Sequence, residues 1–323
     1  MKRFLTLIAL LLTTTLLTAC WEDDVMPPAD PPSVDDGGEG TPEEGTPTIS
    51  LTQDNGVHSF TYSGVAALKD KPVTIHYLIP SAGDMAKMPI LFVFPGEDRS
   101  AAAHLACFSD WAKAQHVMVF AFEFPTAHYP TTTEYILGSI NTKQSAAGVV
   151  TKDKWNFQYV EAVFREIRLF THTTRTSYDM WGHSAGAQYV HRFCTFMEDA
   201  HVSRAIAANS GWYTLADAGT SFPYGYKEIT DVDWTKQLPR VFARTLVVQL
   251  GGADTSTSGL NTNEGSVAQG ATRLARGQYY YETSKSLAAS RSLPFKWTLQ
   301  IVPGVGHDAL RMAQAAQSVL VYN

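Results

Sequence analysis

The chain has 323 residues, of which 45% are hydrophobic and 11% are aromatic. This is enough apolar material for the buried core of one large domain. The formal net charge of −6 argues against a nucleic acid as the main partner, because nucleic-acid-binding proteins carry a basic surface.

Residues 1–19 are typical of a secretory signal peptide. Lys2 and Arg3 precede an apolar stretch, residues 4–17, that is too short and too rich in threonine to span a bilayer permanently. The sequence LTAC at residues 17–20 resembles the lipobox of bacterial lipoproteins. This resemblance implies that Cys20 carries a lipid and holds the protein in the bacterial cell envelope, on the outer membrane. The alternative is an ordinary signal peptide followed by a chance cysteine.

Residues 20–47 form an acidic segment that is rich in proline and glycine and contains no basic residue. The segment carries nine Asp and Glu residues, so the negative charge of the protein belongs to it and the rest of the chain is close to neutral. It has too little apolar surface to fold, and its like charges keep it extended. We therefore expect a disordered tether between Cys20 and a folded domain at residues 48–323.

Two kinds of apolar pattern predict the strands of this domain. Alternating runs occupy residues 57–62 and 72–79, and the later runs are mostly apolar, as in strands that a parallel sheet buries on both faces. These later strands are predicted at residues 89–94, 117–124, 177–181, 204–209, 245–250 and 295–302.

Helical patterns fall between the strands. The predicted helices span residues 100–115, with Ser100 as N-cap, and residues 155–170, 188–198, 273–290 and 308–321. This alternation predicts an α/β fold with a mostly parallel central sheet, helices on both faces and antiparallel strands at its start. Residues 125–154 and 211–243 show no clear element, and we expect these long loops to determine substrate specificity.

The sequence GHSAG at residues 182–186 joins a predicted strand to a predicted helix. A serine between two glycines on such a turn is the nucleophile elbow of α/β-hydrolases. The turn strains the serine backbone and leaves no room for side chains at the flanking positions. Ser184 is therefore the candidate nucleophile, and we expect the adjacent His183 to pack near the elbow rather than act as a base.

A serine hydroxyl needs a base to take its proton and an acid to orient that base. Asp254 and His307 each come just after the carboxyl end of a predicted strand, where open α/β sheets place their sites. They follow Ser184 in the order Ser, Asp, His that α/β-hydrolases use. We predict these three residues as a catalytic triad. Asp308 is the rival acid, but it is expected to cap the last helix.

These motifs resemble those of secreted α/β-hydrolases, in particular polyhydroxybutyrate depolymerases, feruloyl esterases and related lipoprotein esterases. The resemblance covers residues 57–323 and rests on GHSAG at 182–186, GGAD at 251–254 and GVGHD at 304–308. It implies an α/β-hydrolase fold and a serine hydrolase without a cofactor. No metal-binding motif is present, so we expect no metal.

The resemblance also implies an oxyanion hole made by two backbone amides. One belongs to Ala185, which follows the nucleophile. The other lies in the loop at residues 95–99, after the strand at 89–94. This loop usually begins His-Gly, but here it begins Pro95-Gly96-Glu97. By position Glu97 is the second donor. Alternatively, residues 97–99 form a surface turn with an internal ion pair.

Cys107 and Cys194 fall in predicted helices on opposite faces of the sheet. That separation exceeds the reach of a disulfide, so we predict two unpaired, largely buried thiols. The aromatic residues of 211–234, together with Tyr129, Tyr135 and Trp155, either line an apolar cleft or pack beneath loops.

Together these features predict a secreted, lipid-anchored carboxylic ester hydrolase that acts through an acyl-enzyme on a small-molecule or polymeric ester. Two alternatives remain. A serine peptidase or amidase would use the same triad, and a surface binding protein could have kept the scaffold and lost the activity.

Overall fold

The computed structural model describes residues 44–141 and 147–322. The predicted signal peptide, the lipidation site Cys20 and nearly all of the tether lie outside the described residues. Within the described part, none of the helices combines the length and apolar character needed to span a bilayer.

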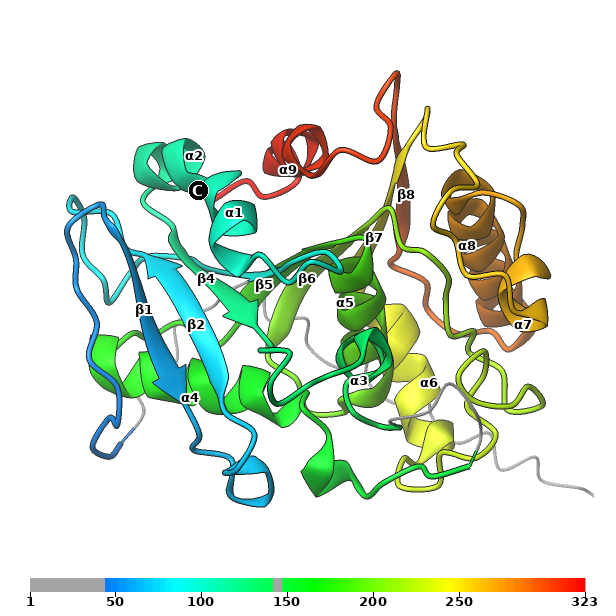
Figure 1. The fold of residues 1–323 in the computed structure, drawn as a ribbon, viewed down its shortest axis with the longest axis horizontal. Coiled ribbons are helices and arrows are strands. Elements are labelled where there is room, and N and C mark those ends of the chain that lie inside the picture. The colour runs from blue at the N-terminus through cyan, green and yellow to red at the C-terminus, as the bar shows by residue number, and fades with distance from the viewer. Residues whose placement is uncertain (1–43, 142–146, 323) are drawn as a thin grey trace, which may run out of the picture. The chain divides into compact units, whose positions relative to one another are not determined.

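The folded part is built on one eight-stranded sheet in the order β1-β2-β4-β3-β5-β6-β7-β8 (Figure 1). β2 pairs antiparallel with both β1 and β4, and all the other neighbours are parallel. This confirms the predicted mostly parallel sheet with antiparallel strands at its start. The strands are β1 Val57–Tyr62, β2 Val73–Leu78, β3 Ile90–Phe94, β4 Met118–Glu123, β5 Tyr178–His183, β6 Val202–Ala208, β7 Thr245–Gly251 and β8 Thr298–Val302.

Burial along the strands follows the sequence pattern. Every residue of β3 and β5 is buried, as a strand covered on both faces requires. The edge strand β1 alternates instead between exposed and less exposed residues. The sheet therefore offers its carboxyl edge, and not its faces, as the place for a site.

Helices cover both faces of the sheet, as predicted (Figure 1). One face packs against α1, α2 and α9, and the other against α4, α5, α6 and α8. The helices are α1 Ala101–Ala106, α2 Ser109–Gln115, α3 Thr132–Ile136, α4 Gln158–Thr171, α5 Ala185–Phe196, α6 Trp234–Ala243, α7 Glu264–Val267, α8 Arg273–Ser290 and α9 Ala309–Gln317, with 3₁₀ turns at Ala66–Leu68 and Lys152–Lys154.

Three predictions about the helices were wrong. The single helix expected at residues 100–115 is two helices, because Phe108 is buried at a turn between them, where its ring packs edge-on against Trp181. Ser100 precedes α1, but its side chain makes no capping bond. The segments without a predicted element contain α3 and α6. α3 is only five residues long, and α6 holds an internal Pro239, so neither gives the usual sequence signal.

Both cysteines of the described part are unpaired, and they lie on opposite faces of the sheet, as predicted. Cys194 is fully buried, and burial raises the pKa of its thiol to about 11. Cys107 is only half-buried, so the prediction of two largely buried thiols holds for Cys194 alone. Cys107 lies at the turn after α1, where its Sγ donates to the carbonyl of Ala103.

Candidate active site

The turn between β5 and α5 consists of one residue, Ser184. Its φ of 56° and ψ of −112° form a backbone conformation that residues with a side chain rarely adopt. The amide of Ser184 donates to the carbonyl of Ala208 in β6 at 2.9 Å, which holds the turn against the sheet. The strained elbow expected from the sequence is thus present.

The two flanking glycines allow three backbone segments to meet. A Cβ atom on Gly182 would lie 2.3 Å from the carbonyl oxygen of Gly186, and one on Gly186 would lie 2.0 Å from that of Phe94. Real Cβ atoms do not approach other atoms so closely, and backbone atoms cannot swing aside. Only glycine therefore lets β5, α5 and the end of β3 come together around Ser184.

The structure brings together the side chains of Ser184, His307 and Asp254. Ser184 Oγ lies 2.9 Å from His307 Nε2, and His307 Nδ1 lies 2.8 Å from Asp254 Oδ2. A carboxylate oxygen only accepts, so Nδ1 carries the proton and Nε2 offers its lone pair to the serine hydroxyl. The Asp254 side chain is 1% exposed and that of His307 is 31% exposed, so the base faces the solvent side and the acid lies beneath it.

Backbone bonds between two loops fix the spacing of the acid and the base. After β7, the amides of Gly252 and Ala253 donate to the carbonyls of Val302 and Val305 in and after β8, both at 2.8 Å. Buried Asn209 also joins the loops, because its side chain accepts from Gly251 N at 2.7 Å and donates to the carbonyl of Gly306. Sequence reasoning missed Asn209, whose role depends wholly on tertiary contacts.

Asp308 does not join this constellation. Its side chain accepts from the amide of Arg311 and caps α9, as predicted. His183 packs against Trp181 on one side and His307 on the other, with ring centroids 6.1 Å and 4.6 Å away. Burial, followed by unfavourable electrostatic interactions with His307, His104 and Arg273, holds the pKa of His183 well below its ordinary value. A buried, uncharged ring agrees with the packing role expected for it.

The loop after β3 lies beside the nucleophile. Glu97 and Ala185 line the same cleft as Ser184, which has a volume of about 290 Å³. In the described part of the chain, neither the Glu97 amide nor the Ala185 amide donates a hydrogen bond to another group. Both amides are therefore available to a ligand in the cleft.

His104, in α1, holds this loop in place and was not singled out by the sequence. Its Nδ1 donates to the carbonyl of Ser100 at 2.9 Å, which leaves Nε2 to accept from the amide of Gly96 at 3.2 Å. Tyr135 in α3 donates its hydroxyl to the carbonyl of Pro95 at 2.8 Å. The peptide group that joins Pro95 to Gly96 is thus held at both its carbonyl and its amide.

The alternative for residues 97–99, a surface turn with an internal ion pair, holds in part: Glu97 and Asp98 form an exposed turn, but among the described residues no ion pair joins them to Arg99. The Arg99 guanidinium is buried and donates to the carbonyls of Phe124, Tyr129 and Thr131. The Glu97 carboxylate instead accepts from the hydroxyl of Thr132 at 2.9 Å. Arg99 therefore ties the loop to the segment that leads into α3.

Both long segments without predicted elements contribute to the cleft. Thr132, Thr133 and Ile136 come from α3, and Trp212 comes from the segment after β6. The remaining aromatic side chains of that segment pack beneath it rather than line the cleft, as Tyr213 and Phe222 do. Trp212 thus borders the cleft and its aromatic neighbours pack, but the cleft is not apolar, because most of its lining residues with side chains are polar or charged.

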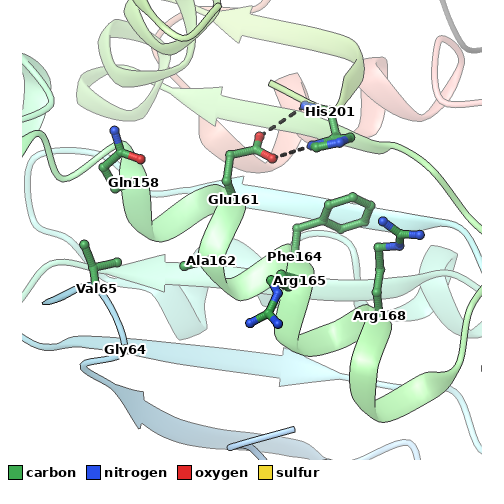
Figure 2. A pocket seen from close by; sticks show the side chains of 9 residues that line it. All are labelled: Gly64, Val65, Gln158, Glu161, Ala162, Phe164, Arg165, Arg168 and His201. Atoms are coloured by element: carbon green, nitrogen blue, oxygen red, sulfur yellow. Dashed lines mark hydrogen bonds and ion pairs between the residues drawn. The ribbon is translucent and has the colours of Figure 1, made fainter. Parts of the chain in front are cut away.

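A second pocket of about 440 Å³ lies against α4 (Figure 2). Arg165 and Arg168 line it, together with Glu161, which pairs with the ring of His201 at 2.6 Å. None of the predicted catalytic residues borders this pocket. Among residues 44–141 and 147–322, no three His, Cys, Asp or Glu side chains gather in a way that could hold a metal ion.

Two solved structures resemble this chain in both sequence and fold. Poly(aspartic acid) hydrolase-1 from Sphingomonas sp. KT-1 is 33% identical with a TM-score of 0.77, over 84% of this chain and 99% of that one. LpqC, a poly(3-hydroxybutyrate) depolymerase from Bordetella parapertussis, is 30% identical with a TM-score of 0.77, over 82% of this chain and 88% of that one.

A more distant structure shares the fold alone. An S-formylglutathione hydrolase from Agrobacterium tumefaciens is 13% identical with a TM-score of 0.52, over 85% of this chain and 97% of that one. No protein-family model and no curated protein matches the chain.

Proposed function

We propose that this hydrolase, which belongs to the α/β-hydrolase family, is a serine esterase. The poly(aspartic acid) hydrolase and the LpqC depolymerase belong to the same family. The observation that supports this most directly is the hydrogen-bonded series Ser184–His307–Asp254, with distances of 2.9 Å and 2.8 Å. A serine hydroxyl bonded to the lone pair of an oriented imidazole is the arrangement that activates a nucleophile.

In the proposed reaction, Ser184 Oγ attacks the acyl carbon of an ester while His307 Nε2 takes its proton. Asp254 keeps Nδ1 protonated and stabilises the imidazolium that forms. The amides of Ala185 and Glu97 donate to the oxyanion of the tetrahedral intermediate. His307 then returns the proton to the leaving alcohol, and a water that His307 deprotonates releases the acid and restores Ser184.

Amide hydrolysis is the second candidate. It is favoured by the 33% identity to an enzyme whose named substrate, poly(aspartic acid), is a chain of amide-linked units. The polyester substrate named for LpqC favours the ester instead. The same triad serves both reactions, which differ in whether His307 protonates an alcohol or an amine. The third possibility, an inactive binding scaffold, is disfavoured by the bonded Ser184 hydroxyl.

The test is labelling of the purified protein with a fluorophosphonate, followed by turnover of p-nitrophenyl acetate and butyrate. We expect Ser184→Ala to abolish both, because the other residues cannot form an acyl-enzyme. Ser286→Ala, on the exposed face of α8, is the matched control and keeps both activities. Labelling without ester turnover would favour the amide-cleaving candidate, and a folded protein that is not labelled would overturn the proposal.

A further inference from the structure

One arginine in the cleft has hydrogen-bond donors that find no acceptor in the described part of the chain. Arg273 is the first residue of α8 and lines the same cleft as Ser184. It is 9% exposed, and its Nε is buried without a hydrogen-bond partner. Its charged neighbour is Asp254, whose Oδ1 lies 3.7 Å from Arg273 Nη1, beyond hydrogen-bond distance. Among the described residues, no group accepts a hydrogen bond from its guanidinium.

Arg276, one turn later on α8, is a comparison for Arg273, because all of its hydrogen bonds go to the protein backbone. Its Nε, Nη1 and Nη2 donate to the carbonyls of Gly270, Gly211 and Asn261 at 2.8–2.9 Å. These three carbonyls belong to the loops around the cleft, and Arg276 holds them together. Arg273 has the same donors and nearly the same burial, yet no carbonyl of residues 44–141 and 147–322 accepts a hydrogen bond from it.

Burying a guanidinium without partners is unfavourable, so the position of Arg273 calls for a ligand group. Its planar fork matches a carboxylate, which can accept two parallel bonds. Asp254 does not fill this role, because its Oδ2 bonds to His307 and its Oδ1 has no hydrogen-bond partner. The other acid at the cleft, Glu97, is engaged by Thr132.

We propose that Arg273 binds a free carboxylate of the substrate next to the scissile bond, so that the enzyme prefers esters that carry an acid group. This rests on the proposed esterase function and specifies its substrate class. The carboxylate displaces water from the guanidinium and forms charge-assisted hydrogen bonds that a neutral ester of the same size cannot form. The preference therefore arises from one side chain and not from the net charge of the domain.

Two matched pairs of substrates test the proposal on the full-length protein. Monoethyl succinate and ethyl butyrate differ by a carboxylate on the acyl side, and 3-acetoxypropanoate and propyl acetate differ by one on the alcohol side. The readout is the ratio of kcat/KM for the charged and the neutral ester of each pair, measured as acid release at constant pH. We expect Arg273→Met to lower this ratio by about 10- to 100-fold in at least one pair, the range for a lost bond to a charged group.

Further variants separate substrate binding from support of the triad. Arg273→Lys keeps the charge and should restore part of the ratio, and Arg291→Met, which removes the same charge from the exposed end of α8, should leave it unchanged. If Arg273→Met lowers kcat/KM equally for charged and neutral esters, the residue only supports Asp254 and the proposal is wrong. Thermal unfolding of each variant verifies that it folds.

If the wild type cleaves none of the four esters, that result counts against the proposed esterase function but not against the carboxylate site at Arg273. A second measurement then tests that site. Butyrate, compared with neutral butanamide, should slow fluorophosphonate labelling of Ser184 in the wild type and lose this effect in Arg273→Met. Equal protection by both compounds, or protection that survives the substitution, would also overturn the proposal.

Discussion

At the scale of single residues, two buried histidines are held uncharged beside the candidate site. His191 in α5 donates from Nδ1 to the carbonyl of Ala187 at 2.9 Å and accepts at Nε2 from the amide of Thr214 at 3.2 Å. The bond accepted at Nε2 requires the neutral ring, and burial holds the pKa of His191 well below its ordinary value. Thr214 follows the cleft residue Trp212 closely, so a charged His191 would disturb the cleft wall. His183 shares this burial.

These histidines predict how stability depends on pH. As the pH falls, the unfolded chain binds protons at the ordinary histidine pKa of about 6.5, whereas the folded protein, with its lowered pKa, does not. The contribution of these neutral histidines to the free energy of unfolding is therefore complete above about pH 6.5. Below that pH the free energy of unfolding declines by up to about 1.4 kcal/mol per pH unit for each such histidine.

Urea unfolding between about pH 7.5 and 5.5 checks this expectation in the wild type, in His191→Gln and in His116→Gln. His191→Gln should show a shallower decline, since one buried titrating group is gone. His116 is exposed at the end of α2 and provides the matched control. Equal slopes for wild type and His191→Gln would contradict the prediction.

The sequence could predict those site residues whose signal is local. Ser184, Asp254 and His307 each follow the end of an apolar strand, and parallel strands bring their carboxyl ends to one edge. His104 and Arg273 carry no such signal, because each is brought to the site by a helix whose orientation depends on packing. The sequence pattern around a helical histidine or arginine is the same whether its side chain faces solvent or the cleft.

At the scale of secondary-structure elements, the elbow depends on close contact between backbones. The end of β3 approaches α5 so closely that Gly186 has no space for a methyl group beside the carbonyl of Phe94. The strands were predictable because their apolar residues either alternate with polar ones, as in β1 and β2, or dominate the run, as in β3 and β4. α6 was not, because Pro239 interrupts its interior and the helix forms through its capping by Asp233 and the burial of one face.

We expect Gly186→Ala to lower the free energy of unfolding by at least about 3 kcal/mol or to prevent folding, since overpacking here moves backbone rather than side chains. Gly306→Ala is the control, because its nearest neighbour would be 3.8 Å away and its φ is not positive. Urea unfolding measures both variants. A Gly186→Ala protein as stable as Gly306→Ala would show that the close approach is not a constraint.

At the scale of the whole molecule, we propose that the hydrolase domain is attached to the outer membrane through a lipid on Cys20. The support is the sequence LTAC at residues 17–20 and the acidic, proline-rich segment that follows it. We propose that this segment is the tether that joins the lipid to the hydrolase domain.

Substitution of the proposed lipid acceptor tests this attachment. Cys20→Ser should move the protein from the membrane fraction to the soluble fraction and abolish incorporation of labelled palmitate, because the thiol that carries the lipid is gone. Cys107→Ser, which removes a half-buried thiol from the folded domain, should remain in the membrane fraction. Membrane association that survives Cys20→Ser would refute the lipid anchor.

The contact between Gly186 and the carbonyl of Phe94 also bears on how this protein can evolve. The nucleophile and the loop that carries Glu97 meet through main-chain atoms, and α3, which forms one wall of the cleft, also holds this loop. Insertions and replacements in the other wall, in the segment of Trp212, can therefore accumulate more freely than changes in α3. A lineage built on this core can acquire new substrates by changing its loops while its chemistry stays constant.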